Sequence, residues 1–171
     1  MNETRAASCM PHSCFCEEIR SDGIRQPANS VSSLAFVLVA VLVLYRRWNT
    51  QRTTASLFAV TLMFVGIGSA WFHAALSFTA QFFDVLGMYL IATLALVLSA
   101  GRSRRLGQAT MASAYLGMNA VLGSILYLAP VYRRWIFGAL LALIIVFEIR
   151  DPVRERRSNN QSRYLVPQPR R

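Results

Sequence analysis

The sequence predicts an all-α fold, a polytopic transmembrane helical bundle with about five spans. Its 171 residues are 54% hydrophobic, with a mean hydropathy of +0.38 and 15% charged residues, whereas about 25% of residues are charged in a soluble domain. All 18 basic residues are Arg, against 8 acids. They lie in short clusters between apolar stretches, which argues against the continuous basic face of a nucleic-acid-binding protein and is typical of arginines that orient a membrane protein.

Five apolar stretches are each long enough to cross the membrane. Crossing about 30 Å of hydrocarbon takes roughly 17 to 25 mostly apolar residues, with every backbone group hydrogen-bonded inside the helix. The first stretch is not a cleaved signal peptide, because it starts late and follows the acids Glu17, Glu18 and Asp22 in place of a short basic region. The five stretches are residues 28–45, 55–72, 82–100, 109–129 and a shorter fifth, 135–149.

The arginines predict which side of the membrane each connection faces. The connection between the second and third stretches has no charge. The positive-inside rule places the arginine-rich connections and the C-terminus in the cytoplasm and the N-terminus outside. Arg133 and Arg134, between the last two stretches, lie on the outer side in this topology. The arginines assigned to the cytoplasm are Arg46, Arg47, Arg52, Arg102, Arg104, Arg105 and seven from Arg150 to Arg171.

The chain therefore divides into three parts. We expect an extracytoplasmic N-terminal segment over 1–27, a transmembrane helical domain over 28–149 and a basic cytoplasmic tail over 150–171. The tail mixes Arg, Ser, Asn, Gln and Pro, so it cannot bury enough apolar surface to fold alone, and we expect it to be disordered. The expected partners are membrane lipids, and no nucleic acid is expected.

The residues that carry chemistry inside the membrane are few and lie together in the sequence. Between Gly23 and Phe147 there is a single acid, Asp84, and a single histidine, His73, on either side of the uncharged connection. Ser69 precedes His73 by four residues and so shares its helix face. Ionisable residues are costly in a membrane span, so these residues mark a candidate functional site.

Three interpretations of this cluster remain open. A serine nucleophile is hard to reconcile with the spacing, because Ser69 and His73 lie one turn apart on one helix while Asp84 would have to hold the other imidazole nitrogen. A zinc site fits better, since His is a common ligand, a carboxylate can accept a proton from bound water, and a hydroxyl can stabilise an oxyanion. The third interpretation is that His73 and Asp84 form a hydrogen-bonded pair that clamps two helices.

This pattern resembles the alkaline ceramidase family of seven-span membrane amidases. The similarity includes Ser69, His73 and Asp84, with three residues between the first two and ten between the last two. It extends to the Gly-x-Gly before Ser69, to the Gln three residues before Asp84, and to the N-terminal stretches 15–18 and 26–36. The resemblance thus covers roughly the first 90 residues.

The resemblance implies zinc-dependent hydrolysis of the amide bond of ceramide or a related sphingolipid. It makes His73 the first zinc ligand, Asp84 the acid/base residue that acts on zinc-bound water, and Ser69 the group that stabilises the tetrahedral oxyanion. On this basis the chain is expected to be an enzyme of sphingolipid metabolism, with a ceramide-like lipid as its substrate.

The resemblance also implies a calcium ion, held in this family by N-terminal acidic and amide groups. Glu17 and Asn29 are the candidate ligands in this chain. Cys14, Ile19 and Gln26 stand where other oxygen ligands are expected. The sequence therefore predicts a weakened calcium site.

The chain departs from the family in its histidines. Family members supply two further zinc ligands from a His-x-x-x-His on the seventh span, whereas the only other histidine here is His12. We therefore expect a C-terminally shortened member with five of the seven spans. The rival interpretation is a non-catalytic membrane protein of the same fold with a structural or lipid-binding role. Assembly of two copies would be one way to complete the site, so a homo-oligomer is kept as a hypothesis.

A second group of potential metal ligands lies near the N-terminus. Cys9, His12, Cys14 and Cys16 are four such side chains within eight residues, but their spacing matches no known zinc motif. A disulfide between two of the cysteines is the simpler interpretation for an oxidising compartment, with metal binding as the alternative.

Overall fold

Helices make up nearly all of the structure, a computed structural model that describes residues 17–47, 53–104 and 106–165. The five long helices are each long and apolar enough to span a membrane. The prediction of an all-α bundle with five spans is confirmed, and the chain is a multi-pass membrane protein. In order, the elements are α2 (Pro27–Arg47), α3 (Thr53–Ala75), α4 (Phe78–Arg104), α5 (Gln108–Leu128), a short 3₁₀ helix η1 (Pro130–Tyr132) and α6 (Arg133–Leu165).

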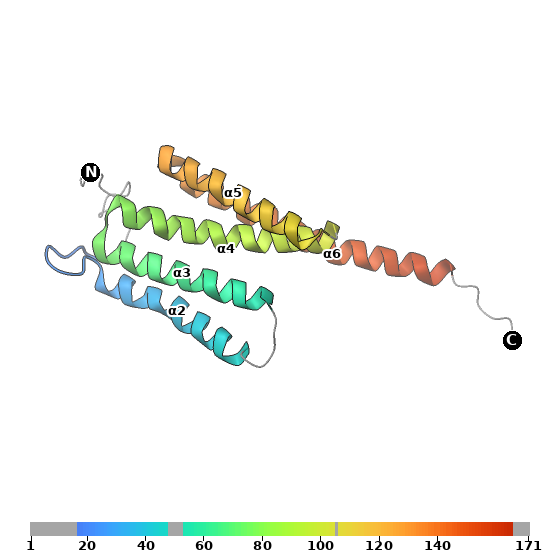
Figure 1. The fold of residues 1–171 in the computed structure, drawn as a ribbon, viewed down its shortest axis with the longest axis horizontal. Coiled ribbons are helices and arrows are strands. Elements are labelled where there is room, and N and C mark those ends of the chain that lie inside the picture. The colour runs from blue at the N-terminus through green and yellow to red at the C-terminus, as the bar shows by residue number, and fades with distance from the viewer. Residues whose placement is uncertain (1–16, 48–52, 105, 166–171) are drawn as a thin grey trace.

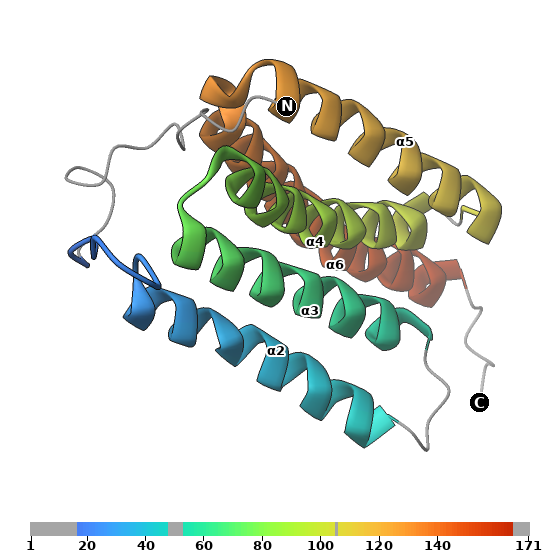
Figure 2. The same cartoon turned by 60° about the vertical axis from the view of Figure 1, so that its left-hand side comes forward.

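Helix α4 is the centre of the bundle (Figures 1 and 2). It packs against α3, α5 and α6, while α2 packs on the far side of α3. Half of the α4 span is buried inside the bundle, against 17% for α2, 11% for α5 and 6% for α6. The outer helices therefore present most of their surface to the surrounding lipid.

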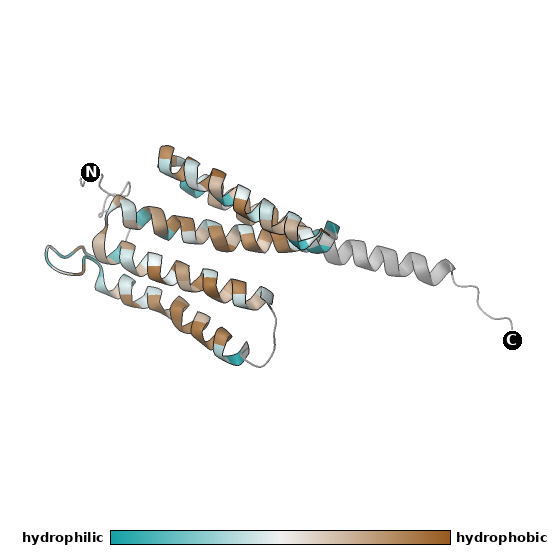
Figure 3. Cartoon of the chain, in the orientation of Figure 1, coloured by the Kyte–Doolittle hydropathy of each residue, from teal (hydrophilic) through white to brown (hydrophobic). Residues whose placement is uncertain are grey.

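The core forms where α4, α5 and α6 meet. Its buried side chains on α4 include Val85, Tyr89 and Leu96, which meet Leu126 of α5 and Leu140 of α6. Apolar residues are not confined to this core, because many large apolar side chains are exposed, and the hydrophobic colour continues along the outer helices (Figure 3). A bundle with this distribution is stable only where lipid surrounds it, because helices that are apolar on every side do not face water.

A tight turn joins α3 to α4. Leu76 adopts a left-handed conformation with φ of 48° and ends α3, as residues just after a helix commonly do. Its backbone N–H donates to the carbonyl oxygen of Phe72 at 2.7 Å. Ser77 then caps α4, with Oγ accepting the N–H of Ala80 at 3.3 Å. The two helices consequently run antiparallel and side by side.

The C-terminal part of the chain differs from the sequence prediction. We expected disorder over 150–171, but α6 continues as a helix to Leu165, and residues 166–171 lie outside the described part. The sequence after Asp151 is rich in Arg, together with Glu and Gln, which have helix propensities close to that of Leu. Once the apolar part of α6 has formed, propagation into these residues avoids a new nucleation step, and the helix continues past Pro152 even though this residue removes one backbone hydrogen bond.

Candidate functional site

Ser69, His73 and Asp84 lie at the same end of the α3–α4 hairpin. Ser69 and His73 are on the last two turns of α3, and Asp84 is on the second turn of α4. Because a two-residue turn joins these antiparallel helices, the structure brings the three residues to a similar depth in the bundle.

Two glycines just before Ser69 let α3 approach both α2 and α4 closely. A Cβ atom at Gly66 would lie 2.7 Å from a side-chain carbon of Val37 on α2. One at Gly68 would lie 3.1 Å from the carbonyl oxygen of Phe83 on α4. Such close approach of helix backbones requires glycine. The Gly-x-Gly motif therefore has a packing role, which sets Ser69 between α2 and α4.

A chain of hydroxyl and carboxyl groups crosses three helices at this level. The Asp84 side chain of α4 lies near Ser69 of α3, and Ser69 Oγ lies 3.1 Å from Oγ of Ser33 on α2. Ser33 is buried, and its Oγ also lies 2.7 Å from the carbonyl oxygen of Asn29. Each hydroxyl has one hydrogen to donate. When Ser33 donates to Asn29, its oxygen is left to accept, so Ser33 influences where the Ser69 hydroxyl points.

The imidazole of His73 is held by Gln26, the residue just before α2. His73 Nδ1 lies 2.7 Å from Gln26 Oε1, and Gln26 is 0% exposed. The amide orientation follows from its other partners, since Gln26 Nε2 donates to the carbonyl oxygen of Glu17 and Oε1 accepts from Asn29 Nδ2, both at 3.4 Å. Nδ1 is therefore the protonated nitrogen, and Nε2 carries the lone pair that can bind a metal or a proton.

Backbone hydrogen bonds fasten the same segment to the end of α3. The N–H of Gln26 donates to the carbonyl oxygen of His73 at 3.0 Å, and that of Arg25 to the carbonyl oxygen of Ala74 at 3.1 Å. These bonds satisfy two of the carbonyl groups that a helix leaves unpaired at its C-terminus. The segment before α2 and the end of α3 are thus one connected unit.

Glu17 and Asn29, the candidate calcium ligands, lie together at the start of α2. The two carboxylate oxygens of Glu17 accept the backbone N–H groups of Ala28 and Asn29, each at 2.8 Å, which caps the helix N-terminus. Calcium takes about six to eight oxygen ligands. Both Glu17 oxygens have N–H partners, and the Asn29 amide nitrogen donates to Gln26. Glu17 and Asn29 alone offer fewer oxygen ligands than a calcium ion takes, and the weakened calcium site stays a prediction.

The donor set for zinc is also incomplete within the described part of the chain. No group of three or more His, Cys, Asp or Glu side chains is placed there to hold a metal, and a catalytic zinc usually takes three protein ligands. His73 and Asp84 provide two donors. The N-terminal candidates Cys9, His12 and Cys14, together with Cys16, lie outside the described residues.

Two residues of this site were missed from the sequence. Gln26 was interpreted as a replaced calcium ligand, whereas the structure pairs it with His73, 47 residues away. Ser33 had no assigned role, and it meets Ser69 across 36 residues. The available signal was that both lie in the stretch 26–36, which resembles the same family as the Ser, His and Asp pattern.

Comparison with known proteins agrees with that resemblance. A family model described as Ceramidase matches residues 13–166. No curated protein and no solved structure matches the chain.

Proposed function

The chain belongs to the ceramidase family, and from this premise we propose that it hydrolyses the amide bond of ceramide or a related lipid amide. The observation that carries the proposal is the arrangement at the end of the α3–α4 hairpin. There, Ser69 and Asp84 lie close to each other and Gln26 orients His73. An acid/base group, a hydroxyl donor and an oriented imidazole are the parts that amide hydrolysis needs.

Each residue has a role that follows from its contacts. Asp84 accepts a proton from the attacking water and returns it to the departing amine, so that a C–O bond forms as the C–N bond breaks. Ser69 donates its hydroxyl hydrogen to the carbonyl oxygen as negative charge develops there. Gln26 accepts a hydrogen bond from Nδ1 of His73 and so fixes the ring, with the lone pair on Nε2.

Zinc is proposed as the cofactor, although the described residues alone do not complete its site. A bound zinc ion would supply Lewis-acid activation. His73 is its proposed ligand, and Asp84 lies at a similar depth on α4. Any remaining ligand comes from outside the described residues or from a second copy of the chain. The proposal therefore rests on the family to which the chain belongs and on the arrangement of Ser69, His73 and Asp84.

A non-catalytic role is the second candidate, and one observation favours it. His73 is hydrogen-bonded to the segment before α2 and Asp84 lies near Ser69 of α3, as expected of residues that only hold a bundle together. In that case the hairpin serves packing or lipid binding. Loss of His73 would then lower stability without removing any hydrolytic activity.

The deciding experiment is lipid-amide hydrolysis by the purified full chain in detergent, with ceramide as substrate and release of the long-chain base as readout. His73→Ala, Asp84→Asn and Ser69→Ala are compared with Ser113→Ala, an exposed serine on α5. We expect each site variant to lose about 100-fold or more of the rate and the control to keep it. A chelator should abolish the activity. A wild-type chain without activity, or activity that survives His73→Ala, overturns the proposal.

We also propose the orientation, with the N-terminus outside and the C-terminus in the cytoplasm. The supporting observation is the arginine content of the connections between α2 and α3 and between α4 and α5. A reporter fused after Arg171 should then report a cytoplasmic location. A periplasmic or lumenal signal would contradict this topology.

A further inference from the structure

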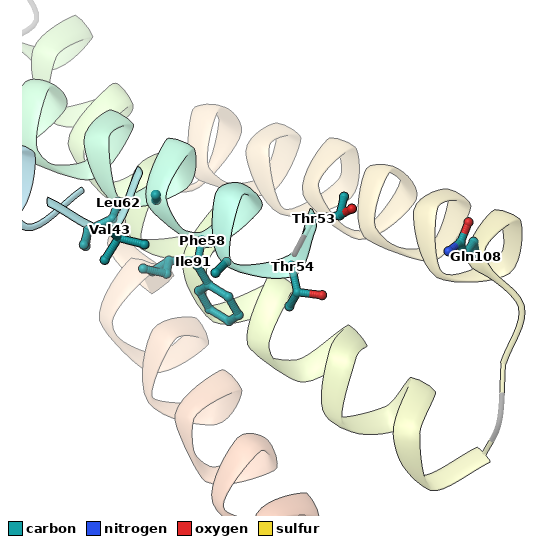
Figure 4. A pocket seen from close by; sticks show the side chains of 9 residues that line it. Val43, Thr53, Thr54, Phe58, Leu62, Ile91 and Gln108 are labelled. Atoms are coloured by element: carbon teal, nitrogen blue, oxygen red, sulfur yellow. The ribbon is translucent and has the colours of Figure 1, made fainter. Parts of the chain in front are cut away.

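A cavity of about 650 Å³ lies at the end of the bundle remote from Ser69 (Figure 4). Its walls are apolar where α2, α3 and α4 meet, with Val43, Phe58, Leu62 and Ile91 among the lining side chains. Thr54 at the start of α3 and Gln108 at the start of α5 add polar groups. The volume lies in the range of about 300 to 1,000 Å³ that is usual for small-molecule sites.

The shape of this cavity suits an extended chain. The α3 lining runs from Thr53 to Leu62, which corresponds to about 14 Å along the helix at 1.5 Å per residue. Thr61 of α3, next to Leu62, lies near Tyr115 of α5. Because its lining follows α3 over this length, we refer to the cavity as the groove.

Small side chains on α3 create the room. Ala55 and Ala59 both line the groove, at positions one turn apart on the same helix face. The groove lies between the helices of a membrane bundle, so lipid acyl chains have direct access to it. An acyl chain is therefore the ligand group that fits its apolar part.

The opening of the groove favours negative charge. Arg46 lies one turn beyond Val43 on α2, and Arg104 ends α4 at the same end of the bundle. Residues at the N-termini of α3 and α5 line the cavity as well, and helix N-termini carry partial positive charge. The sequence has no acid in the stretches 41–59 and 100–108 that surround the opening. An anionic headgroup would thus meet only favourable charge in these segments.

We propose that this groove binds one anionic membrane phospholipid, with an acyl chain along Phe58 and Leu62 and the headgroup among the arginines at the opening. This site is distinct from the hydrolytic one, since Thr53 and Ser69 are separated by about 24 Å of helix at 1.5 Å per residue. Ceramide has no charged headgroup, so the charge at the opening favours a phospholipid over the proposed substrate.

Native mass spectrometry of the full chain in detergent tests the proposal with two defined lipids. Dioleoyl phosphatidylglycerol and dioleoyl phosphatidylcholine have the same acyl chains and differ in headgroup charge. We expect one phosphatidylglycerol per chain, retained about tenfold more strongly than phosphatidylcholine, since each arginine at an anionic lipid adds attraction. Equal retention of the two lipids by the wild-type chain overturns the proposal without reference to any variant.

Two pairs of variants locate the lipid. Ala55→Phe fills the groove and should lower retention of phosphatidylglycerol about tenfold or more, whereas Ala142→Phe on the exposed face of α6 should not. Arg46→Gln should weaken retention of phosphatidylglycerol about fivefold. Arg150→Gln, which removes the same charge from α6, is the matched control. Unchanged retention in Ala55→Phe would refute the site. The readout involves no hydrolysis, so this result is independent of the proposed enzymatic function.

Discussion

Gln26 and His73 form a 2.7 Å hydrogen bond between the segment that precedes α2 and the last turn of α3. The bond joins a fully buried amide to the one imidazole of the membrane domain. It selects the ring nitrogen that carries the proton and restricts rotation of the ring. A residue outside the Ser, His and Asp pattern therefore determines how the histidine of that pattern is presented.

Replacing Gln26 should change how the His73 ring is held. Gln26→Leu removes the acceptor for the Nδ1–H of His73, and we expect the free energy of unfolding to fall by about 1–3 kcal/mol. Gln26→Glu retains an acceptor oxygen and should lose less. Denaturation in detergent measures both variants, and ¹⁵N NMR of the imidazole reports the tautomer. A Leu variant with wild-type stability and an unchanged tautomer would show that the bond has no such role.

The close approach of α3 and α4 predicts opposite effects for two glycines. A Cβ at Gly68 would meet the backbone of α4 at 3.1 Å, whereas nothing lies within 4 Å of one at Gly117 on α5. Gly68→Ala should force the two helices apart and lower the melting temperature. Gly117→Ala should leave it unchanged or raise stability by up to about 1 kcal/mol through helix propensity. Equal effects of the two substitutions would contradict this account of the Gly-x-Gly motif.

A hydrogen bond inside the membrane links α4 to α5. Asn119 Nδ2 donates to Thr93 Oγ1 at 2.8 Å, and Thr93 is fully buried. In a double-mutant cycle with Thr93→Val and Asn119→Leu, we expect a coupling energy of about 0.6 kcal/mol and at most about 1.7 kcal/mol, as for other interhelical hydrogen bonds in membranes. The free energy of unfolding in detergent is measured for the wild type, the two single variants and the double variant. A coupling of zero would mean that the two side chains contribute independently.

An ion pair links α4 to α6 at the arginine-rich end. Arg102 lies 2.6 Å from a carboxylate oxygen of Glu148, and the buried Ser99 also donates to that oxygen. Glu148→Leu should lower the melting temperature, because it leaves Arg102 and Ser99 without their shared acceptor. The charge swap Arg102→Glu with Glu148→Arg should recover part of the loss. Arg104→Gln is the matched control, for which we expect no change.

The spans could be predicted from the sequence because the physical constraint acts locally. A helix that crosses hydrocarbon must be apolar for its whole length and must satisfy its own backbone, so a window of the sequence suffices to find it. The end of α6 could not be predicted in this way, because the same reasoning treats polar sequence as unable to fold alone. It does not consider that an existing helix can extend into such a sequence without a new nucleation step, as α6 does to Leu165.

Part of the candidate site could likewise be predicted from the sequence, and part of it could not. Ser69, His73 and Asp84 are close in the sequence and joined by one short turn, so helix periodicity places them at one end of a hairpin. Gln26 and Ser33 reach the site only through the packing of α2 against α3, across 47 and 36 residues. No local pattern contains that information.

By itself, the sequence determined that this protein is a helical membrane protein, and it identified the hairpin that carries the candidate chemistry. The reason is that the apolar length of a span and the cost of an ionisable group within it are both properties of one helix. Only the tertiary structure decided which groups hold His73 and Ser69, how closely α3 and α4 approach at Gly68, and that a groove lies where α2, α3 and α4 meet. These features depend on distances between helices, which are set by the packing of side chains from separate parts of the chain.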